Sequence, residues 1–187
     1  IDILHKAAAL IGENVDLLRD LIILEIGKPF LESEEEVLRT VDLIDYYAEE
    51  GRRLCGDVWE SSAFPGYKKN KVAIARRVPL GVVLAVPPFN YPINEGAPKI
   101  VGALVSGNTV ILKPSTQGAI SSLHMVELFH QAGLPEGVLN CVTGKGEDVG
   151  DFLVTHPLID AINLTGSYET ANEVAHKAGM KKLLFGL

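Results

Sequence analysis

Apolar residues recur every three or four positions through the first fifty residues of the chain, with polar residues between them. This spacing is typical of amphipathic helices that bury one face. The pattern is interrupted near residues 12–14 and again at 27–29, and it ends at Gly51. We therefore predict a pair of helices followed by one longer helix, which makes residues 1–56 mainly helical.

The longer helix begins near Glu32 and carries three consecutive acidic residues, Glu34, Glu35 and Glu36. Negative charge is favourable near the start of a helix, and acidic runs usually face solvent. We therefore expect these glutamates to point outward and the apolar residues of the same helix to point inward. The residues expected to point inward are Val37, Leu38, Val41, Ile44 and Tyr47.

The spacing of apolar residues changes at Val72, where the helical pattern gives way to short apolar runs. Short apolar runs then alternate with helical patterns over residues 72–187, and the run 81–86 is continuously apolar, as in a strand buried on both faces. This alternation predicts an α/β fold with a doubly wound, Rossmann-like parallel sheet, whose ligands bind beyond the carboxyl ends of the strands. The predicted strands are 72–75, 81–86, 109–113, 138–143, 161–164 and a buried 183–187, and the predicted helices are 94–105, 119–132, 147–154 and 168–178.

Composition and charge exclude several classes of protein. The 187 residues are 47% hydrophobic and 22% charged, as in a packed globular protein. The formal net charge of −7 provides no positive field for a nucleic acid, and no apolar run approaches the roughly 18 residues that a membrane span needs. Because a helical pattern begins at Ile1 and a strand pattern runs to Leu187, we expect the chain to be a piece of a longer polypeptide.

The cysteines and histidines do not indicate a site. Two widely spaced cysteines, Cys55 and Cys141, favour a reducing, cytoplasmic compartment without a disulfide, and we expect both to be structural thiols. The five histidines show no metal-ligand spacing, so no metal is expected.

The segment after the predicted strand 81–86 contains Pro88, Asn90 and Tyr91. The side-chain amide of Asn90 is a neutral donor near the start of a helix, and such a donor can stabilise a developing oxyanion. The alternative is that Asn90 only caps the following helix. The spacing alone does not separate these two roles.

The predicted strand 109–113 ends in Lys113, and Ser115 and Thr116 follow it. In a doubly wound sheet this place holds the adenosine ribose of a dinucleotide, and the acidic residue that usually binds the 2′-hydroxyl is missing here. A cation without a nearby carboxylate can accept a 2′-phosphate, so the segment favours NADP. The alternative is that Lys113 extends along apolar surface to solvent.

The last two turns of the predicted sheet contain glycines. Residues 144–150 resemble a phosphate-binding glycine loop, but they carry acidic residues and one residue too many before the last glycine. In the segment Thr165-Gly166-Ser167, the glycine allows close approach of the backbone, and Ser167 can donate to a phosphate at a helix N-terminus. Ordinary capping by Thr165 or Ser167 is the alternative.

Five segments carry a recognisable combination of residues: PLGVV at 79–83, PFNYP at 88–92, GNTVILKPS at 107–115, AGLPEGVLN at 132–140 and LTGS at 164–167. Their order and spacing resemble those of the aldehyde dehydrogenase superfamily, over nearly the whole chain. Four shorter motifs resemble those of its non-phosphorylating glyceraldehyde-3-phosphate dehydrogenases: TQG at 116–118, TGKG at 143–146, GD at 150–151 and AGM at 178–180.

The resemblance implies the nucleotide-binding domain of a homo-oligomeric enzyme that oxidises an aldehyde, glyceraldehyde-3-phosphate, and transfers hydride to NADP or, alternatively, NAD. It implies a catalytic cysteine beyond Leu187. By the same resemblance, Asn90 is the oxyanion-hole amide, and Arg53 and Tyr91 bind the substrate phosphate; packing of Arg53 along the surface is the alternative. The cofactor-binding residues that it implies are Pro88, Lys113, Ser115, Thr116, Gly146, Gly150, Thr165, Gly166 and Ser167.

Two positions depart from the family's pattern. Ala171 stands where the helix after Thr-Gly-Ser usually has a second glycine, and alanine still permits close packing. Gly186 falls on the position of the family's general-base glutamate, and a glycine cannot activate water. Two alternatives therefore stay open: a nucleotide-binding family member without dehydrogenase activity, and an enzyme that transfers its acyl group to coenzyme A.

Overall fold

The computed structural model of the protein describes residues 1–63, 66 and 71–187. Three helices form the N-terminal part, α1 (Asp2–Glu13), α2 (Val15–Ile26) and α3 (Phe30–Glu50). The predicted helical pair and the longer helix are confirmed. Helix α2 ends at Gly27, whose φ of 67° is a left-handed conformation that glycine adopts without strain.

Helix α3 packs against α1, α2 and α4 (Gly96–Val105), so its buried face is wider than its apolar stripe. Val37 and Ile44 point inward as expected, but Leu38 is exposed. The prediction that Glu36 points outward is wrong, because this residue is 1% exposed and lies against the segment that precedes α4. The acidic run at the start of α3 therefore contributes one residue to the interior.

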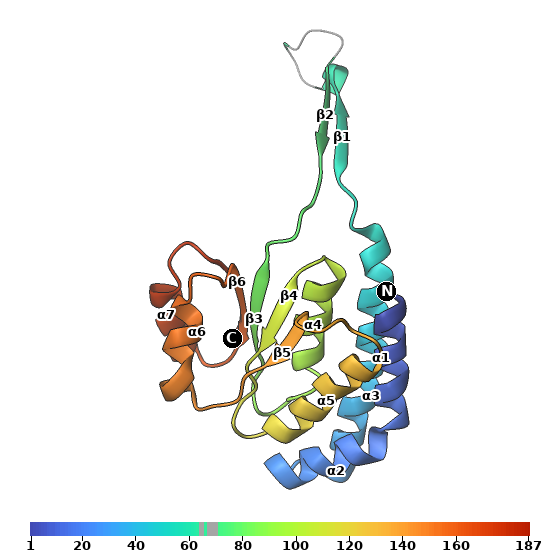
Figure 1. Ribbon diagram of the computed structural model, residues 1–187, viewed down its shortest axis with the longest axis vertical. Helices are drawn as coiled ribbons and strands as arrows, with labels where there is room; N and C mark the ends of the chain where they lie inside the picture. The colour runs from blue at the N-terminus through green and yellow to red at the C-terminus, as the bar shows by residue number, and fades with distance from the viewer. Residues whose placement is uncertain (64–65, 67–70) are drawn as a thin grey trace.

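A two-stranded antiparallel hairpin follows α3, and Figure 1 shows it projecting away from the rest of the molecule. It pairs β1 (Asp57–Glu60) with β2 (Val72–Ala75), and the side chains of both strands are exposed. Short 3-10 turns at Gly51–Arg53 and Ser61–Ala63 flank β1. The prediction that the main sheet begins at residue 72 is wrong, because β2 pairs with β1 instead.

The main sheet has five parallel strands in the order β5-β4-β3-β6-β7. Strand β3 lies at the centre, and the chain builds the sheet outward from it first on one side and then on the other. The predicted doubly wound parallel sheet is therefore confirmed. The strands are β3 (Val82–Val86), β4 (Thr109–Leu112), β5 (Leu139–Cys141), β6 (Ala161–Thr165) and β7 (Lys182–Gly186).

Helices cover both faces of the five-stranded sheet (Figure 1). On one face, Val83 and Ala85 belong to a core that includes residues of α1 to α5, whereas on the other face Leu84 and Ile162 pack with residues of α6 and α7. Successive side chains of β3 thus enter different cores, which explains its continuous apolar sequence. The remaining helical elements are α5 (Ala119–Gln131), a π-helical turn (Gly146–Gly150), α6 (Asp151–Thr155) and α7 (Tyr168–Lys177).

Strand β7 is at the edge of the sheet and has one neighbouring strand, β6. The prediction of a buried strand at 183–187 is wrong in this respect, because Leu183 and Leu184 are exposed. Within the described ranges, the structure contains no helix with the length and apolar character of a membrane span.

Candidate functional site

The connections that leave β3 and β6 diverge at the carboxyl ends of these neighbouring strands. The chain leaves β3 through α4 toward β4, and it leaves β6 through α7 toward β7 on the other side. Open α/β sheets bind ligands at such a topological switch point. A cavity of about 550 Å³ lies there. The predicted site residues that line it are Pro88, Asn90, Tyr91, Lys113, Ser115, Thr165, Gly166 and Ser167.

A second cavity, of about 530 Å³, lies between the sheet and helices α6 and α7. The predicted residues Gly146 and Gly150 line it, and a Cβ atom on either glycine would have no heavy atom within 4 Å. Val86 and Lys113 line both cavities, which are therefore adjacent parts of one groove. Each volume is in the range of small-molecule and cofactor sites, about 300–1,000 Å³.

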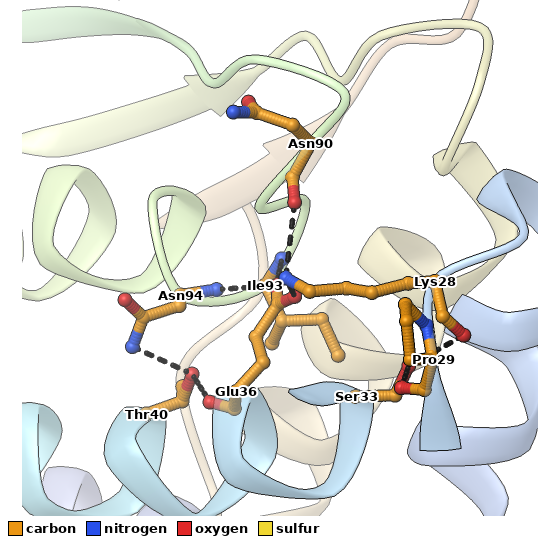
Figure 2. A network of polar contacts seen from close by, with 8 residues as sticks. All are labelled: Lys28, Pro29, Ser33, Glu36, Thr40, Asn90, Ile93 and Asn94. Atoms are coloured by element: carbon orange, nitrogen blue, oxygen red, sulfur yellow. Dashed lines mark hydrogen bonds and ion pairs between the residues drawn. The ribbon is translucent and has the colours of Figure 1, made fainter. Parts of the chain in front are cut away.

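Asn90 lies in the segment between β3 and α4. Its alternative role as a helix cap is wrong, because α4 begins at Gly96 and Glu95 occupies its N-cap position. Within the part of the chain that the structure describes, the Asn90 side-chain amide has no hydrogen-bond partner, and Figure 2 shows it directed away from the polar contacts nearby. This neutral donor is available to negative charge that develops on a bound substrate.

A buried carboxylate that the sequence analysis missed holds the segment after Asn90. Oε1 of Glu36 accepts hydrogen bonds from the backbone N–H groups of Ile93 at 3.0 Å and Asn94 at 3.2 Å. Oε2 of Glu36 accepts one from Nζ of Lys28 at 2.7 Å. Figure 2 shows these contacts meeting at one point between α3 and the segment before α4. Both carboxylate oxygens are therefore hydrogen bonded, which offsets the free-energy cost of burying the charge.

The Lys28 ammonium makes two further contacts in this network. It donates to the backbone oxygen of Asn90 at 3.1 Å and lies 3.4 Å from the centre of the Tyr91 ring, a cation–π contact. A sequence signal was present in α3, where small polar residues share a helical face with buried apolar ones. The buried residues of that face are Ser33, Glu36, Val37, Thr40 and Ile44.

Lys113 follows β4 and lies at the junction of the two cavities. The alternative in which it extends to solvent is wrong, because the residue is 8% exposed and its Nζ donates to the backbone oxygen of Pro114 at 3.1 Å. Among the described residues, no carboxylate lies within ion-pair distance of its ammonium. Burial lowers the pKa of Lys113 because the charged form loses solvation. A bound anion would supply the missing counter-charge.

The two residues predicted to act beside Lys113 differ in position. Ser115 lines the first cavity, and its Oγ accepts from the backbone N–H of Gln117 at 3.3 Å. Thr116 is exposed and lines neither cavity. A contact between Thr116 and a 2′-phosphate stays a prediction.

Ser167 caps α7, since its Oγ accepts from the backbone N–H of Thr170 at 3.3 Å. The capping alternative is therefore present, and Ser167 also lines the cavity, so the N-terminus of α7 borders the groove. A helix N-terminus carries positive potential that favours an anion. A Cβ on the neighbouring Gly166 would contact only Leu164, at 3.5 Å, so the neighbours do not require glycine there.

The hydroxyl of Thr165 is already engaged. It accepts a hydrogen bond from Nζ of Lys99 at 2.6 Å and donates to Oε2 of Glu95 at 3.3 Å. Lys99 is buried within the apolar stripe of α4, a position where a lysine signals a specific partner. Neither Lys99 nor Glu95 was predicted from the sequence. These bonds use the O–H donor of Thr165 and one lone pair of its Oγ1, and the residue lines the cavity, so its contact with a cofactor stays a prediction.

The predicted convergence of Arg53 and Tyr91 on one phosphate is wrong. Tyr91 contacts Lys28, the partner of Glu36 near the start of α3, whereas Arg53 follows the end of that helix. With a rise of 1.5 Å per residue, Glu36 and Glu50, the last residue of α3, are roughly 21 Å apart along the helix axis. Arg53 instead pairs with Glu50 at 2.7 Å, and its side chain is 78% exposed.

Gly186 ends β7 beside Thr165. A Cβ atom on Gly186 would lie 2.8 Å from Oγ1 of Thr165, so a side chain there would require the threonine to move. The nearby carboxylate is that of Glu95, which lines both the Asn90 cavity and a smaller cavity beside Gly186.

The two cysteines have different surroundings. Cys141 is partly buried on β5, and burial raises the pKa of its thiol to about 11, as expected of an unreactive thiol. Cys55 is exposed, and its role as a structural thiol stays a prediction. The described residues contain no cluster of three or more His, Cys, Asp or Glu side chains that could hold a metal ion.

Comparison with known proteins identifies the family of this chain. The sequence model of the aldehyde dehydrogenase family matches residues 1–187. The chain is 48% identical over 184 residues to the NADP-dependent glyceraldehyde-3-phosphate dehydrogenase of Triticum aestivum, an alignment that covers 97% of this chain and 37% of that protein. It is 40% identical over 187 residues to the D-glyceraldehyde dehydrogenase (NADP(+)) of Picrophilus torridus, covering 99% of this chain and 37% of the relative.

A solved structure is also similar to this chain. It is the NADP-dependent glyceraldehyde-3-phosphate dehydrogenase from Bacillus halodurans C-125, complexed with NADP, with a TM-score of 0.97 and 45% identity. The match covers 100% of this chain and 39% of that one. The chain thus spans about 37% of the length of the curated relatives.

Proposed function

The chain belongs to the aldehyde dehydrogenase family, and from this premise we propose that the whole protein oxidises an aldehyde to the carboxylic acid and transfers hydride to NADP. Relatives at 46–48% identity carry the name NADP-dependent glyceraldehyde-3-phosphate dehydrogenase, which supports glyceraldehyde-3-phosphate as the aldehyde. When bound, NADP supplies the hydride acceptor.

The observation that carries the cofactor assignment is the Lys113 ammonium. It is buried at the topological switch point, it has no carboxylate partner among the described residues, and it faces both halves of the groove. These properties fit the adenosine ribose of NADP and its 2′-phosphate. In this proposal, Ser167 and the N-terminus of α7 bind the pyrophosphate, and Gly146 and Gly150 leave room for the rest of the nucleotide.

Asn90 acts on the aldehyde in this proposal. When a nucleophile adds to the carbonyl carbon, negative charge develops on the carbonyl oxygen, and the Asn90 amide donates a hydrogen bond to it. Neither Cys55 nor Cys141 lines the groove, so the attacking thiol is proposed to come from the rest of the whole protein.

The test is the rate of NADPH formation by the full-length protein with two aldehydes. We expect a higher kcat/KM for glyceraldehyde-3-phosphate than for glyceraldehyde, as the names of the relatives at 46–48% identity suggest. An equal or reversed order would favour a neutral aldehyde, as in the name of the Picrophilus torridus relative. No NADPH with either aldehyde would contradict the proposed function.

Gly186 supports a second candidate function. Because the position of the family's general-base glutamate carries no side chain, release of an acyl group to water lacks this base. An acyl-enzyme could instead be resolved by coenzyme A, or the protein could bind the nucleotide without turnover. A rapid burst of NADPH that stops after one turnover, and resumes when coenzyme A is added, would favour the acyl-transfer function; sustained turnover in water would contradict it.

The β1–β2 hairpin supports a homo-oligomer. Val58, Trp59, Val72 and Ile74 are exposed on it, and exposed apolar groups on a projecting hairpin are typical of a protein interface. We expect sedimentation of the full-length protein to show an oligomer and Trp59→Ser with Ile74→Ser to reduce its size. Unchanged sedimentation of the double variant would contradict a role of the hairpin.

The cytoplasm is the compartment that we propose, supported by two cysteines that are both free thiols in the structure. Cell fractionation tests it, and recovery of the protein from an oxidising compartment would contradict it.

A further inference from the structure

We propose that Lys28 and Glu36 are positioning residues, which fix the Asn90 segment so that its side-chain amide faces the cleft. This inference rests on the proposed function, because it gives a catalytic task to Asn90. It concerns residues from the α2–α3 connection and from α3, outside the parallel sheet that forms the groove.

The first support is the number of contacts that this ion pair makes with one short segment. Lys28 contacts the backbone oxygen of Asn90 and the ring of Tyr91, while Glu36 accepts from the N–H groups of Ile93 and Asn94. Four of the five residues from 90 to 94 are therefore bound by two side chains. A salt bridge that only joined α3 to its neighbours would not need these contacts.

The second support is which atoms of Asn90 are used. The network binds its backbone oxygen and leaves its amide without a partner among the described residues (Figure 2). A bond to the carbonyl fixes the orientation of the peptide group that follows Asn90, and thus restrains the direction of the side chain. A displacement of about 1 Å at a reacting group can lower a rate by 10²-fold, so this restraint is relevant to catalysis.

The third support is burial. The Lys28 side chain is 8% exposed and that of Glu36 is fully buried. Replacement of a buried ion pair by apolar residues is often neutral or stabilising, so stability alone does not explain why charges stand here. Fixing a backbone segment by charge-assisted hydrogen bonds requires such groups, because apolar side chains cannot bind backbone N–H and C=O groups.

The test is a double-mutant cycle in the full-length enzyme, with kcat and KM measured separately. If Lys28 acts through Asn90, Lys28→Met lowers kcat about tenfold in the wild-type background and less than about twofold in the Asn90→Ala background, because the group that it positions is gone. The KM for NADP stays unchanged in both. Lys28→Arg, which keeps a cation and its donors, restores part of the loss.

Arg52→Met is the matched control, since it removes a cation from an exposed ion pair at the C-terminal end of α3. We expect its kcat to equal that of the wild type. An equal fold-loss from Lys28→Met in both backgrounds, or no loss in either, would overturn the proposal and leave Lys28 a structural residue.

Amide hydrogen exchange provides a readout that does not require activity. We expect Lys28→Met and Glu36→Gln to accelerate exchange at Ile93 and Asn94 while the core of the sheet stays protected. Glu36→Gln carries the cycle if Lys28→Met does not fold. Unchanged exchange in the variants overturns the positioning role, whereas the absence of aldehyde oxidation in the wild type would contradict only the proposed function.

Discussion

Residues 90–94 and 113–117 occupy corresponding places in the fold, since each segment follows a strand of the parallel sheet and lines the same groove. The first is held by a buried ion pair from another part of the chain. The described side-chain hydrogen bonds of the second stay within the segment, from Lys113 to Pro114 and from Gln117 to Ser115. The wall formed by residues 90–94 is thus held by side chains from another segment. The wall formed by residues 113–117 contains a buried cation without a counter-ion among the described residues.

This difference separates two tasks. A group that stabilises developing charge has to be in place before the reaction, because reorganisation would add to the barrier. A group that binds an anionic cofactor gains its partner when the cofactor arrives. We therefore expect substitutions on the Asn90 wall to change turnover and those on the Lys113 wall to change cofactor affinity.

Asn90→Ala is expected to have the largest effect, a decrease in kcat of roughly 10²–10³-fold. Because Asn90 is not the N-cap of α4, the melting temperature should stay close to that of the wild type. Steady-state kinetics and thermal unfolding of the full-length protein check both. A decrease in stability with most of the turnover retained would contradict the role of the amide.

Lys113→Met is expected to raise the Kd for NADP by roughly 10–100-fold, the effect of about 1.5–3 kcal/mol from a hydrogen bond to a charged group. Equilibrium titration with NADP measures this change. Lys6→Met on α1 removes the same charge at a residue that lines neither cavity and serves as the control. Equal affinities in the two variants would contradict the assignment of Lys113.

The pH dependence of NADP affinity is a second test of the role of Lys113 in cofactor binding. Burial lowers the pKa of Lys113, so its ammonium loses its proton at a lower pH than an ordinary lysine does. Only the charged form attracts a phosphate, so affinity should fall as the pH rises through this lowered pKa. Titrations of Lys113→Met over the same pH range should lack this decrease; its persistence would mean that another group is responsible.

Thr116→Glu is expected to have a smaller effect, a shift of a few-fold from NADP toward NAD. Thr116 is exposed and outside both cavities, so a carboxylate there would repel a 2′-phosphate through solvent, where charge interactions are weak. The ratio of kcat/KM for the two cofactors measures the shift. An unchanged ratio would remove Thr116 from the site.

The two cysteines are expected to matter least for function, because neither lines the groove, but their reactivity toward a thiol label should differ. Since burial raises the pKa of Cys141 to about 11, little thiolate is present near neutral pH, whereas Cys55 is exposed. Mass spectrometry after brief alkylation should find label on Cys55 well before Cys141. Faster labelling of Cys141 than of Cys55 would contradict the burial of Cys141 on β5.

The sequence was informative where local pattern decides the structure. The continuously apolar 81–86 run and the turn residues after each strand predicted the parallel sheet and located Asn90, Lys113 and Ser167 at its carboxyl edge. It could not predict which side chains contact residues of distant segments. Glu36 is buried against Ile93 and Asn94, which lie 57 and 58 positions later in the chain. The periodicity of one helix gives no information about such contacts.

The same limit explains the other errors. Residues 72–75 have a strand pattern, but only tertiary structure decides whether they pair with β1 or with the main sheet. Arg53 was assigned to the site by resemblance to the family alone, and the length of α3 separates it from Tyr91.

The measurement that tests the division between the two walls most directly is the rate of NADPH formation over a range of NADP concentrations. It compares the full-length wild type with Asn90→Ala and Lys113→Met at saturating aldehyde. We expect Asn90→Ala to lower the maximal rate without changing the half-saturating NADP concentration, and Lys113→Met to raise that concentration without lowering the maximal rate. If both variants changed the same parameter, the two walls would not have separate tasks.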